Sequence, residues 1–193
     1  MSGFEKLTVA VLAAGQSSRY GANKLEQVLA GEALALHVAR TIAGLPFARR
    51  LAVCSAERGS VPDGFRALGI EVLVNPSPEA GQSSSLAIAS RAARTGHSEG
   101  LVICLADMPL VSAGLLRALV DAWATDPEGA VVSVAGTYRG PPAILPSSMF
   151  DAVEAGTGDR GARDLLAKAR GVIAASAELI DVDRPADLEQ IKG

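Results

Sequence analysis

An apolar run that ends directly at a glycine constrains the fold of this chain most. The segment Leu7–Ala14 contains no charged residue, and Gly15 follows it. A one-sided antiparallel strand would alternate apolar and polar residues, so the continuous run indicates a parallel strand that is buried on both faces. The loop after Ala14 therefore leaves from the carboxyl end of a strand, the edge at which open α/β sheets bind ligands.

Further short apolar runs alternate with helical patterns along the chain. The predicted strands are Leu7–Ala13, Leu51–Cys54, Glu71–Val74, Leu101–Ala106, Ala130–Ala135, Val172–Ala175 and Leu179–Val182. The predicted helices are Leu34–Ile42, Ser83–Ala93, Leu115–Trp123 behind a cap at Ser112, Phe150–Glu154, Ala162–Ala169 and Pro185–Ile191. This alternation predicts parallel βαβ units, whose right-handed crossovers put helices on both faces of the sheet. We therefore expect an α/β fold, a three-layer α/β/α sandwich around a mostly parallel sheet that is Rossmann-like in outline.

The length of the chain and one break in the alternation predict its domain organisation. With 193 residues, the chain is long enough for one α/β domain with a substantial core. Residues 136–142 are rich in glycine and proline and interrupt the alternation. We predict a single domain over residues 1–193, with an insertion on the substrate side of the sheet around residues 136–171.

Composition and charge exclude several classes of partner. The formal net charge is -3 and the isoelectric point is about 5.4, whereas nucleic-acid-binding surfaces are normally basic. Aromatic residues make up 4% of the chain, too few for base-stacking platforms. The sequence contains neither the ~20-residue apolar run of a membrane span nor the basic and apolar regions of a signal peptide. We therefore expect a cytoplasmic protein that binds a small ligand, and neither nucleic acid nor a membrane.

The loop after Gly15 has the composition of a phosphate-binding loop. Small residues, a second glycine at Gly21 and a cation at Arg19 lie between Gly15 and Lys24. Backbone N–H groups of such a loop can approach phosphate oxygens closely, and the two cations would complement a triphosphate. The spacing matches neither G-x-x-x-x-G-K-[ST] nor G-x-G-x-x-G, so a P-loop and a dinucleotide-binding domain are disfavoured. The alternative is a surface loop with solvated charges.

A carboxylate follows a second buried strand. Asp107 comes directly after Leu101–Ala106 and should emerge at the same sheet edge as Gly15. Bound phosphates repel a nearby carboxylate unless a cation lies between them, and Mg²⁺ shared by carboxylates and phosphates meets this need. The segment therefore predicts a magnesium site. The alternative is that Asp107 only begins a turn before Pro109.

Two aspartates near the carboxyl end of the chain are further candidate ligands. Alternation at the end of an apolar run would put Asp181 and Asp183 on one strand face, where either could be a second metal ligand. Asp183 could instead cap the last helix, with Pro185 in its first turn. The residues alone leave both roles open.

Two more segments contain polar groups suited to substrate binding. Gly81–Leu86 combines a glycine with amide and hydroxyl side chains at a predicted helix start, which could hydrogen-bond a base or ribose. Helix capping alone would also explain these serines. Gly156–Arg163 offers an anion-binding helix start with nearby arginines, and a capped surface turn is its alternative.

Together these motifs resemble those of the nucleotidyltransferase superfamily that includes the molybdenum-cofactor guanylyl- and cytidylyltransferases. The matching segments are, in order, Leu12–Gly15 with Ser18–Gly21 and Lys24, Gly81–Leu86, Leu105–Pro109 and Asp183–Leu188. The Ala13-Ala14-Gly15 turn, the serine-rich segment and Gly158–Arg163 resemble the cytidylyltransferase branch most. The resemblance implies a Rossmann-like nucleotidyltransferase fold of the GT-A-like type.

The resemblance also implies roles for individual residues. Lys24, Arg19 and Asp107 would be catalytic, and Asp107 and Asp183 would hold Mg²⁺. The implied nucleotide-binding residues are Leu12, Ala13, Ala14, Gly15, Gln16, Ser17, Ser18, Arg19, Gly21, Lys24, Gly81, Gln82, Ser83 and Ser85. The implied acceptor-facing residues are Arg139, Gly140, Asp159, Arg160 and Arg163.

The implied reaction is the Mg²⁺-dependent transfer of CMP from CTP to the phosphate of molybdopterin, with release of pyrophosphate and with a molybdoenzyme or maturation protein as partner. Ala14 stands where the guanylyl branch has a second glycine, which favours a pyrimidine base. GMP transfer, or transfer to another phosphorylated metabolite, is the alternative. Tyr20, Pro141 and Arg184 depart from the family pattern, and a carrier that binds nucleotide or cofactor without turnover is the alternative from another class.

Overall fold

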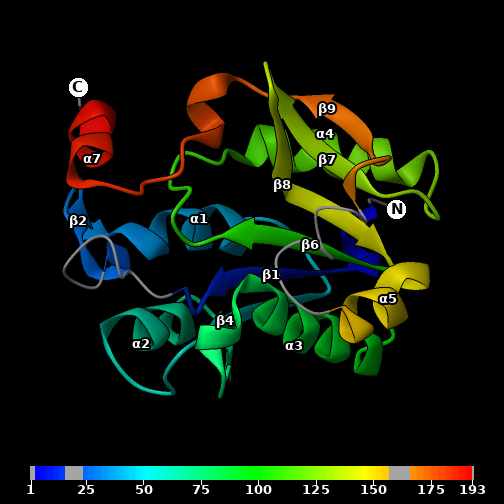
Figure 1. The fold of residues 1–193 in the computed structure, drawn as a ribbon, viewed down its shortest axis with the longest axis horizontal. Coiled ribbons are helices and arrows are strands. Elements are labelled where there is room, and N and C mark those ends of the chain that lie inside the picture. Colours follow the sequence, from blue (N-terminus) through cyan, green and yellow to red (C-terminus); the bar gives the residue numbers. More distant parts are fainter. Residues whose placement is uncertain (1–2, 16–23, 157–165, 193) are drawn as a thin grey trace.

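The computed structural model describes residues 3–15, 24–156 and 166–192, and a seven-stranded sheet is its central element (Figure 1). The strands are β1 (Leu7–Ala13), β4 (Arg49–Cys54), β5 (Glu71–Val74), β6 (Gly100–Leu105), β7 (Val131–Ala135), β8 (Tyr138–Pro146) and β9 (Arg170–Ile173). Their order across the sheet is β5-β4-β1-β6-β8-β7-β9. Strand β8 runs antiparallel to both neighbours, and the other paired strands are parallel. The predicted mostly parallel sheet is confirmed.

Helices cover both faces of this sheet. They are α1 (Leu34–Ala43), α2 (Ser60–Ala67), α3 (Gln82–Thr95), α4 (Ala113–Ala124) and α5 (Phe150–Ala155). The last helix, α7 (Pro185–Lys192), packs in a separate cluster instead. Buried side chains of α1, α2 and α4 share one core cluster, and those of α3 and α5 share the other. Ser112 caps α4, because its hydroxyl accepts a hydrogen bond from the Leu115 N–H at 3.1 Å. The predicted three-layer sandwich is confirmed.

Strand β1 lies between β4 and β6 inside the sheet, and every one of its residues is buried. Val9 and Val11 belong to one core cluster, whereas Ala10 and Leu12 belong to the other, so both faces of the strand are covered. From β1 the chain proceeds outward through β4 and β5 and then crosses to β6 on the other side. The helices α1 and α3 consequently lie on opposite faces, and a crevice forms at the carboxyl ends of β1 and β6.

The carboxyl-terminal segment packs against a small hairpin at this same edge. Strands β2 (Val28–Leu29) and β3 (Glu32–Ala33) are joined by Ala30 and Gly31, which both have positive φ as a two-residue hairpin turn requires. Leu29, Leu34, Val182 and Leu188 form a separate buried cluster between hairpin and segment. Figure 1 shows α7 beside β2. The cluster anchors the residues just before α7 near Lys24.

Three regions differ from the sequence-based expectation. The predicted strand Leu179–Val182 is wrong: a 3-10 turn covers Ser176–Leu179, and the Val182 N–H donates to the Asp107 carbonyl in a loop rather than to a strand. Helix α2 was not predicted. Residues 138–146, expected in an insertion over the sheet edge, form β8 inside the sheet. Residues 157–165 lie outside the described residues, so an insertion there stays a prediction.

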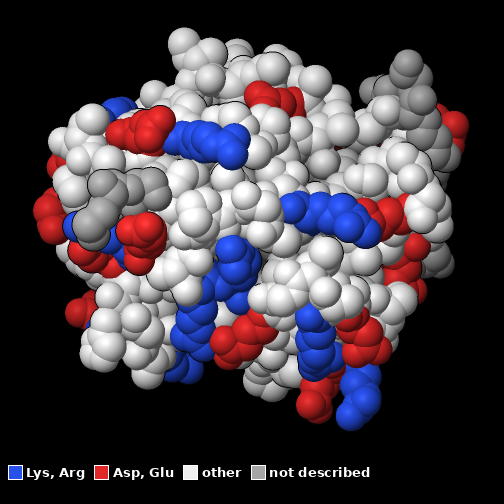
Figure 2. Space-filling model, turned by 180° about the vertical axis from the view of Figure 1, so that it is seen from behind, with Lys and Arg blue, Asp and Glu red and all other residues white. Residues whose placement is uncertain are grey.

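On the face seen in Figure 2, basic and acidic side chains lie interspersed among uncharged ones. In the described part of the chain, no helix has the length and apolar character to cross a membrane.

Candidate functional site

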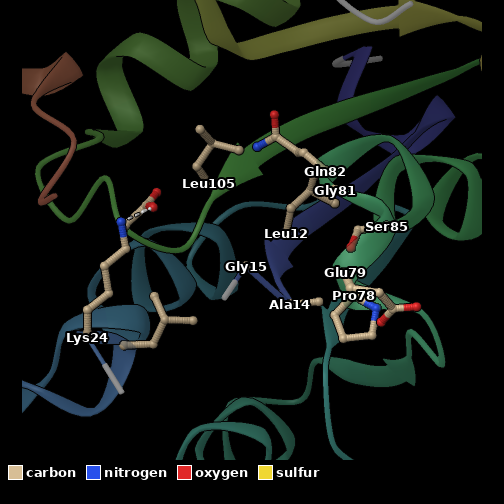
Figure 3. A pocket seen from close by; sticks show the side chains of 12 residues that line it. Leu12, Ala14, Gly15, Lys24, Pro78, Glu79, Gly81, Gln82, Ser85 and Leu105 are labelled. Carbon is tan, nitrogen blue, oxygen red and sulfur yellow. Dashed lines mark ion pairs between the residues drawn. The ribbon is translucent and has the colours of Figure 1, made fainter. Parts of the chain in front are cut away.

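A cavity of about 310 Å³ lies at the carboxyl ends of β1 and β6, where the topology predicts a ligand crevice. It is lined by Leu12, Ala14, Gly15, Lys24, Leu25, Pro78, Glu79, Gly81, Gln82, Ser85, Leu105 and Asp107. Figure 3 shows Lys24 at one end, Pro78, Glu79 and Ser85 at the other, and Gly15 between them. The volume is at the lower end of the range for small-molecule sites.

Lys24 and Asp107 meet at the charged end of this cavity. Lys24 begins the short 3-10 turn Lys24–Glu26, and Asp107 follows β6. The Ala106 N–H donates to the Leu12 carbonyl at 3.2 Å, which ties the start of the Asp107 loop to the end of β1. The Lys24 Nζ lies 2.8 Å from the Asp107 Oδ2, the ion pair marked in Figure 3. Both side chains are largely buried, with 13% and 21% of their surface exposed.

The carboxyl-terminal segment brings two more carboxylates to Lys24. The Val182 N–H donates to the Asp107 carbonyl at 3.0 Å, and this bond lays the segment along the Asp107 loop. The Lys24 Nζ is 3.2 Å from the Asp183 Oδ1 and 3.7 Å from the Asp181 Oδ1. The predicted convergence of these aspartates is observed, although a loop rather than a strand face produces it.

Asp187, not Asp183, satisfies the backbone at the start of α7. Its Oδ2 accepts hydrogen bonds from the N–H groups of Asp183 at 2.9 Å and Arg184 at 2.7 Å. The Asp183 side chain instead reaches Lys24. Of the two roles that the sequence left open for Asp183, helix capping is therefore performed by another residue.

Charge and burial shift the pKa values of this cluster. Burial lowers the pKa of Lys24, but the charges and hydrogen bonds of Asp107, Asp181 and Asp183 outweigh burial and hold it above its ordinary value. Burial raises the pKa of Asp181 to about 7, with the neighbouring Asp107 and Asp183 carboxylates acting in the same direction against Lys24. The described groups thus place more carboxylate charge here than one ammonium can balance.

The donor set suits a divalent cation. The Asp107 Oδ1 is buried and has no hydrogen-bond partner among the described residues, an unusual state for a carboxylate oxygen. Carboxylate oxygens are the ligands that Mg²⁺ and Mn²⁺ prefer. The described residues nevertheless include no group of three or more His, Cys, Asp and Glu side chains arranged to hold a metal. The aspartates point at the Lys24 ammonium instead.

Neutral hydrogen bonds organise the opposite end. Asn75 follows β5 and is 1% exposed. Its Nδ2 donates to the hydroxyls of Ser84 at 2.8 Å and Ser85 at 2.9 Å, and its Oδ1 accepts from the Ser77 N–H at 2.9 Å. These bonds connect the loop after β5 to the first turn of α3. They hold the lining residues of this segment in place.

Most predicted nucleotide-binding residues that the structure describes line the cavity. Those that line it are Leu12, Ala14, Gly15, Lys24, Gly81, Gln82 and Ser85. Ala13 lines a smaller neighbouring cavity of about 90 Å³, and Ser83 is among neither set of lining residues described here. Gln16, Ser17, Ser18, Arg19 and Gly21 lie outside the described residues. The predicted catalytic pair Lys24 and Asp107 is brought together.

Two of the predicted acceptor-facing residues, Arg139 and Gly140, lie outside the described cavity. The Arg139 guanidinium donates to the carbonyl of Ala169, so it is engaged in holding β8 and the segment before β9. Gly140 is buried, and the Tyr138 hydroxyl lies 3.0 Å from the position that a Cβ on Gly140 would take. Neither residue lines the described cavity. Asp159, Arg160 and Arg163 lie outside the described residues.

Sequence reasoning missed Tyr138 and Asn75, which do not line the cavity but interact with residues around it. Burial raises the pKa of Tyr138 to about 12, and the nearby charges of Asp181 and Asp107 add to the effect. Its hydroxyl donates to the Pro141 carbonyl at 2.6 Å. Asn75 carried one available signal, because it directly follows an apolar run at the ligand-binding edge. The sequence around Tyr138 carried no comparable signal.

Comparison with known proteins identifies relatives over nearly the whole chain. The sequence profile of the MobA-like NTP transferase domain matches residues 9–173. The purine catabolism protein PucB of Bacillus subtilis (strain 168) is 34% identical over 197 residues, covering 94% of this chain and 93% of PucB.

Solved structures share the fold at lower identity. Rv0371c of Mycobacterium tuberculosis H37Rv is 23% identical, with a TM-score of 0.78 over 96% of each chain. A second structure of Rv0371c, in complex with manganese, has a TM-score of 0.72 at 21% identity, covering 96% of this chain and 97% of that one. Molybdopterin-guanine dinucleotide biosynthesis protein A of Archaeoglobus fulgidus has a TM-score of 0.71 at 21% identity, again over 96% of each chain.

Proposed function

The chain belongs to the MobA-like NTP transferase domain family, a family of nucleotidyltransferases, and from that premise we propose that it transfers CMP from CTP to the phosphate of molybdopterin with release of pyrophosphate. One observation carries the proposal. Lys24 and Asp107 lie 2.8 Å apart at one end of a cavity that also extends along Ala14, Gly15 and the polar start of α3. Such a cavity can hold a triphosphate at its charged end and a base at the opposite end, called the neutral end here after the uncharged hydrogen bonds of Asn75, although the Glu79 carboxylate also lines it.

The reaction needs little chemistry from the protein. An oxygen of the acceptor phosphate forms a bond to the α-phosphorus of CTP, and the bond between that phosphorus and the pyrophosphate oxygen breaks, with its electron pair leaving on pyrophosphate. The attacking phosphate is already an anion, so no general base is required. The residues align the two substrates and stabilise the developing charge. Lys24 is suited to the triphosphate, with Arg19 as a second cation.

The cluster of carboxylates supports a divalent cation as cofactor, with Mg²⁺ the proposed ion. Asp107 would hold it through the Oδ1 that lacks a partner among the described residues, together with Asp183. When bound, the ion supplies positive charge to the phosphates. Lys24, which now contacts these aspartates, would then face the triphosphate.

The proposal also specifies cytosine as the base and a pterin phosphate as the acceptor. Ala14 is 3% exposed and lines the cavity, so its methyl group reduces the room for a purine and favours CTP. The name of the Archaeoglobus protein links that protein to molybdopterin, which supports a pterin acceptor here but also makes GTP the main competitor. The acceptor-facing roles of Asp159, Arg160 and Arg163 belong to this proposal, as does a molybdoenzyme or maturation protein that receives the product.

Calorimetry with CTP and GTP, each with and without Mg²⁺, tests the proposal first. We expect Mg²⁺-dependent binding with CTP preferred, followed by pyrophosphate release when a phosphorylated pterin is added. A preference for GTP would make guanine, in place of cytosine, the assigned base. Tight binding of nucleotide without pyrophosphate release, in the presence of a verified acceptor, would favour a carrier instead of an enzyme.

A further inference from the structure

Asn75 connects the sheet to the neutral end of the cavity. Its hydrogen bonds fix the orientation of its side-chain amide. Its backbone N–H donates to the Cys54 carbonyl at 2.8 Å, which fixes the residue beyond the ends of β4 and β5. The Ser77 N–H can only donate, so the amide atom that it meets at 2.9 Å must be the oxygen. The Asn75 nitrogen therefore faces Ser84 and Ser85 and can only donate to them.

The hydroxyl protons of Ser84 and Ser85 differ in whether they have an acceptor within the protein. The Ser84 hydroxyl accepts from Asn75 and donates to the Gly81 carbonyl at 2.7 Å, so both of its functions are satisfied within the protein. The Ser85 hydroxyl also accepts from Asn75, but no acceptor for its proton occurs among the described residues. Ser85 is 4% exposed and lines the cavity. A buried donor without a partner is costly unless a ligand or water accepts from it.

We propose that Asn75 is a positioning residue that holds Ser85 as a hydrogen-bond donor toward the nucleotide base, and thereby selects a base with acceptor atoms at that point. The inference rests on the proposed function, because it needs the base at this end of the cavity. Cytosine presents two adjacent acceptors, the carbonyl O2 and the ring N3. Uracil presents an N–H donor at N3 instead. Both bases accept at O2, so a fixed donor that faces N3 favours cytosine over uracil.

The substitution Asn75→Asp reverses the polarity with almost no change in size. A carboxylate still accepts from the Ser77 N–H, but it can no longer donate to the serines, so each hydroxyl turns its proton toward residue 75. Ser85 then offers the cavity an acceptor. We expect the affinity for CTP in the presence of Mg²⁺ to fall about tenfold, the order of one lost hydrogen bond, with UTP affected less. The ratio of CTP to UTP affinity falls accordingly.

Matched serine variants separate positioning from general damage. Ser85→Ala removes the donor and should lower the ratio of CTP to UTP affinity about as much as Asn75→Asp does. Ser84→Ala removes the other hydroxyl bound by Asn75, and we expect less than a threefold change in that ratio, because Ser84 does not line the cavity. In the double variant Asn75→Asp with Ser85→Ala, the ratio should equal that of Ser85→Ala alone, since Asn75 acts through Ser85.

Calorimetric titration of wild type and these variants with CTP, UTP and GTP tests the positioning role of Asn75. Thermal unfolding is the control for folding. If Asn75→Asp fails to fold, the contrast between Ser85→Ala and Ser84→Ala still decides. An unchanged ratio of CTP to UTP affinity in Ser85→Ala, or in folded Asn75→Asp, would overturn the role of Asn75 and leave the proposed function standing. A wild type that binds no triphosphate would overturn both.

Discussion

The two ends of the cavity are held together by different forces. At the charged end, Lys24 lies within 4 Å of Asp107, Asp181 and Asp183. At the neutral end, Asn75 holds Ser77, Ser84 and Ser85 by ordinary hydrogen bonds. Among the described residues, the Asn75 amide and the Ser84 hydroxyl at the neutral end have hydrogen-bond partners, whereas the charged end retains a buried carboxylate oxygen without a partner.

This difference separates a preformed subsite from one that a ligand completes. Neutral hydrogen bonds each stabilise a protein by roughly 1 kcal/mol and keep a subsite rigid before the ligand arrives. Unbalanced buried carboxylates are costly, and added positive charge relieves that cost. We therefore expect cations and phosphates to act on the charged end and base identity to be read at the neutral end.

The largest effect should follow the loss of the Asp107 charge. Asp107→Asn keeps the shape but removes the carboxylate, so turnover should fall about 10²–10³-fold, as for loss of one preorganised electrostatic group. Binding of cytidine, which lacks phosphates, should change little because it tests the neutral end. Pyrophosphate release measures the first and calorimetry the second.

The control for this experiment is Asp126→Asn, because the Asp126 carboxylate is half exposed in an ion pair with Arg170. It should retain the turnover of the wild type. Near-normal Mg²⁺-dependent turnover in Asp107→Asn would contradict the assignment of the charged end.

Lys24 should have opposite effects on metal and on turnover. Lys24→Met removes the ammonium that now faces the aspartates, so Mn²⁺ without nucleotide should bind about fivefold tighter, because an ion pair of roughly 1 kcal/mol no longer competes with the metal. Turnover should fall about a hundredfold because the triphosphate loses a cation. Electron paramagnetic resonance of free Mn²⁺ measures the first effect. Lys6→Met, which breaks the exposed pair with Glu99, should leave both unchanged.

Weaker or unchanged Mn²⁺ binding by Lys24→Met would show that the lysine does not compete with a metal. The same outcome would remove the distinction between a charged end that a ligand completes and a neutral end that is preformed.

A smaller effect should separate Asp181 from Asp183. The Asp183 Oδ1 lies nearer to the Lys24 cation, at 3.2 Å against 3.7 Å for Asp181. We expect Asp183→Asn to raise the metal concentration needed for half-maximal turnover about tenfold, the scale of losing a group that supports a metal site. Asp181→Asn should raise it less than twofold. The reverse ranking would make Asp181 the second ligand.

Features that are local in the sequence were predicted better than features that depend on distant contacts. The strand Leu7–Ala13 was predicted to the residue, because a strand buried between two parallel neighbours leaves a continuous apolar run. Asp107 was predicted because it directly follows such a run at the binding edge. These features are local, so the order of residues along the chain contains them.

The remaining features depend on contacts between distant segments. In Leu179–Val182, Leu179 packs in the core cluster of α1, α2 and α4, whereas Val182 packs in the small cluster and donates to the Asp107 carbonyl, so the apolar residues are buried without forming a strand. Tyr138 approaches the aspartates only because β8 lies beside β6, a pairing that the pattern around residue 140 did not predict. The roles of Gln16, Ser17, Ser18, Arg19 and Gly21 stay predictions.

The smallest predicted effect concerns a single methyl group at the neutral end. Ala14→Gly should shift the ratio of CTP to GTP affinity toward GTP about fourfold, the ~0.8 kcal/mol of one methyl-sized group, because it enlarges the space beside the base. The matched control is Ala13→Gly, which alters the same segment but faces the neighbouring cavity and should leave the ratio unchanged. Competition calorimetry measures both ratios. If the two glycine variants shift the ratio equally, loop flexibility rather than the Ala14 methyl group governs base choice, and the neutral end is less rigid than its hydrogen bonds indicate.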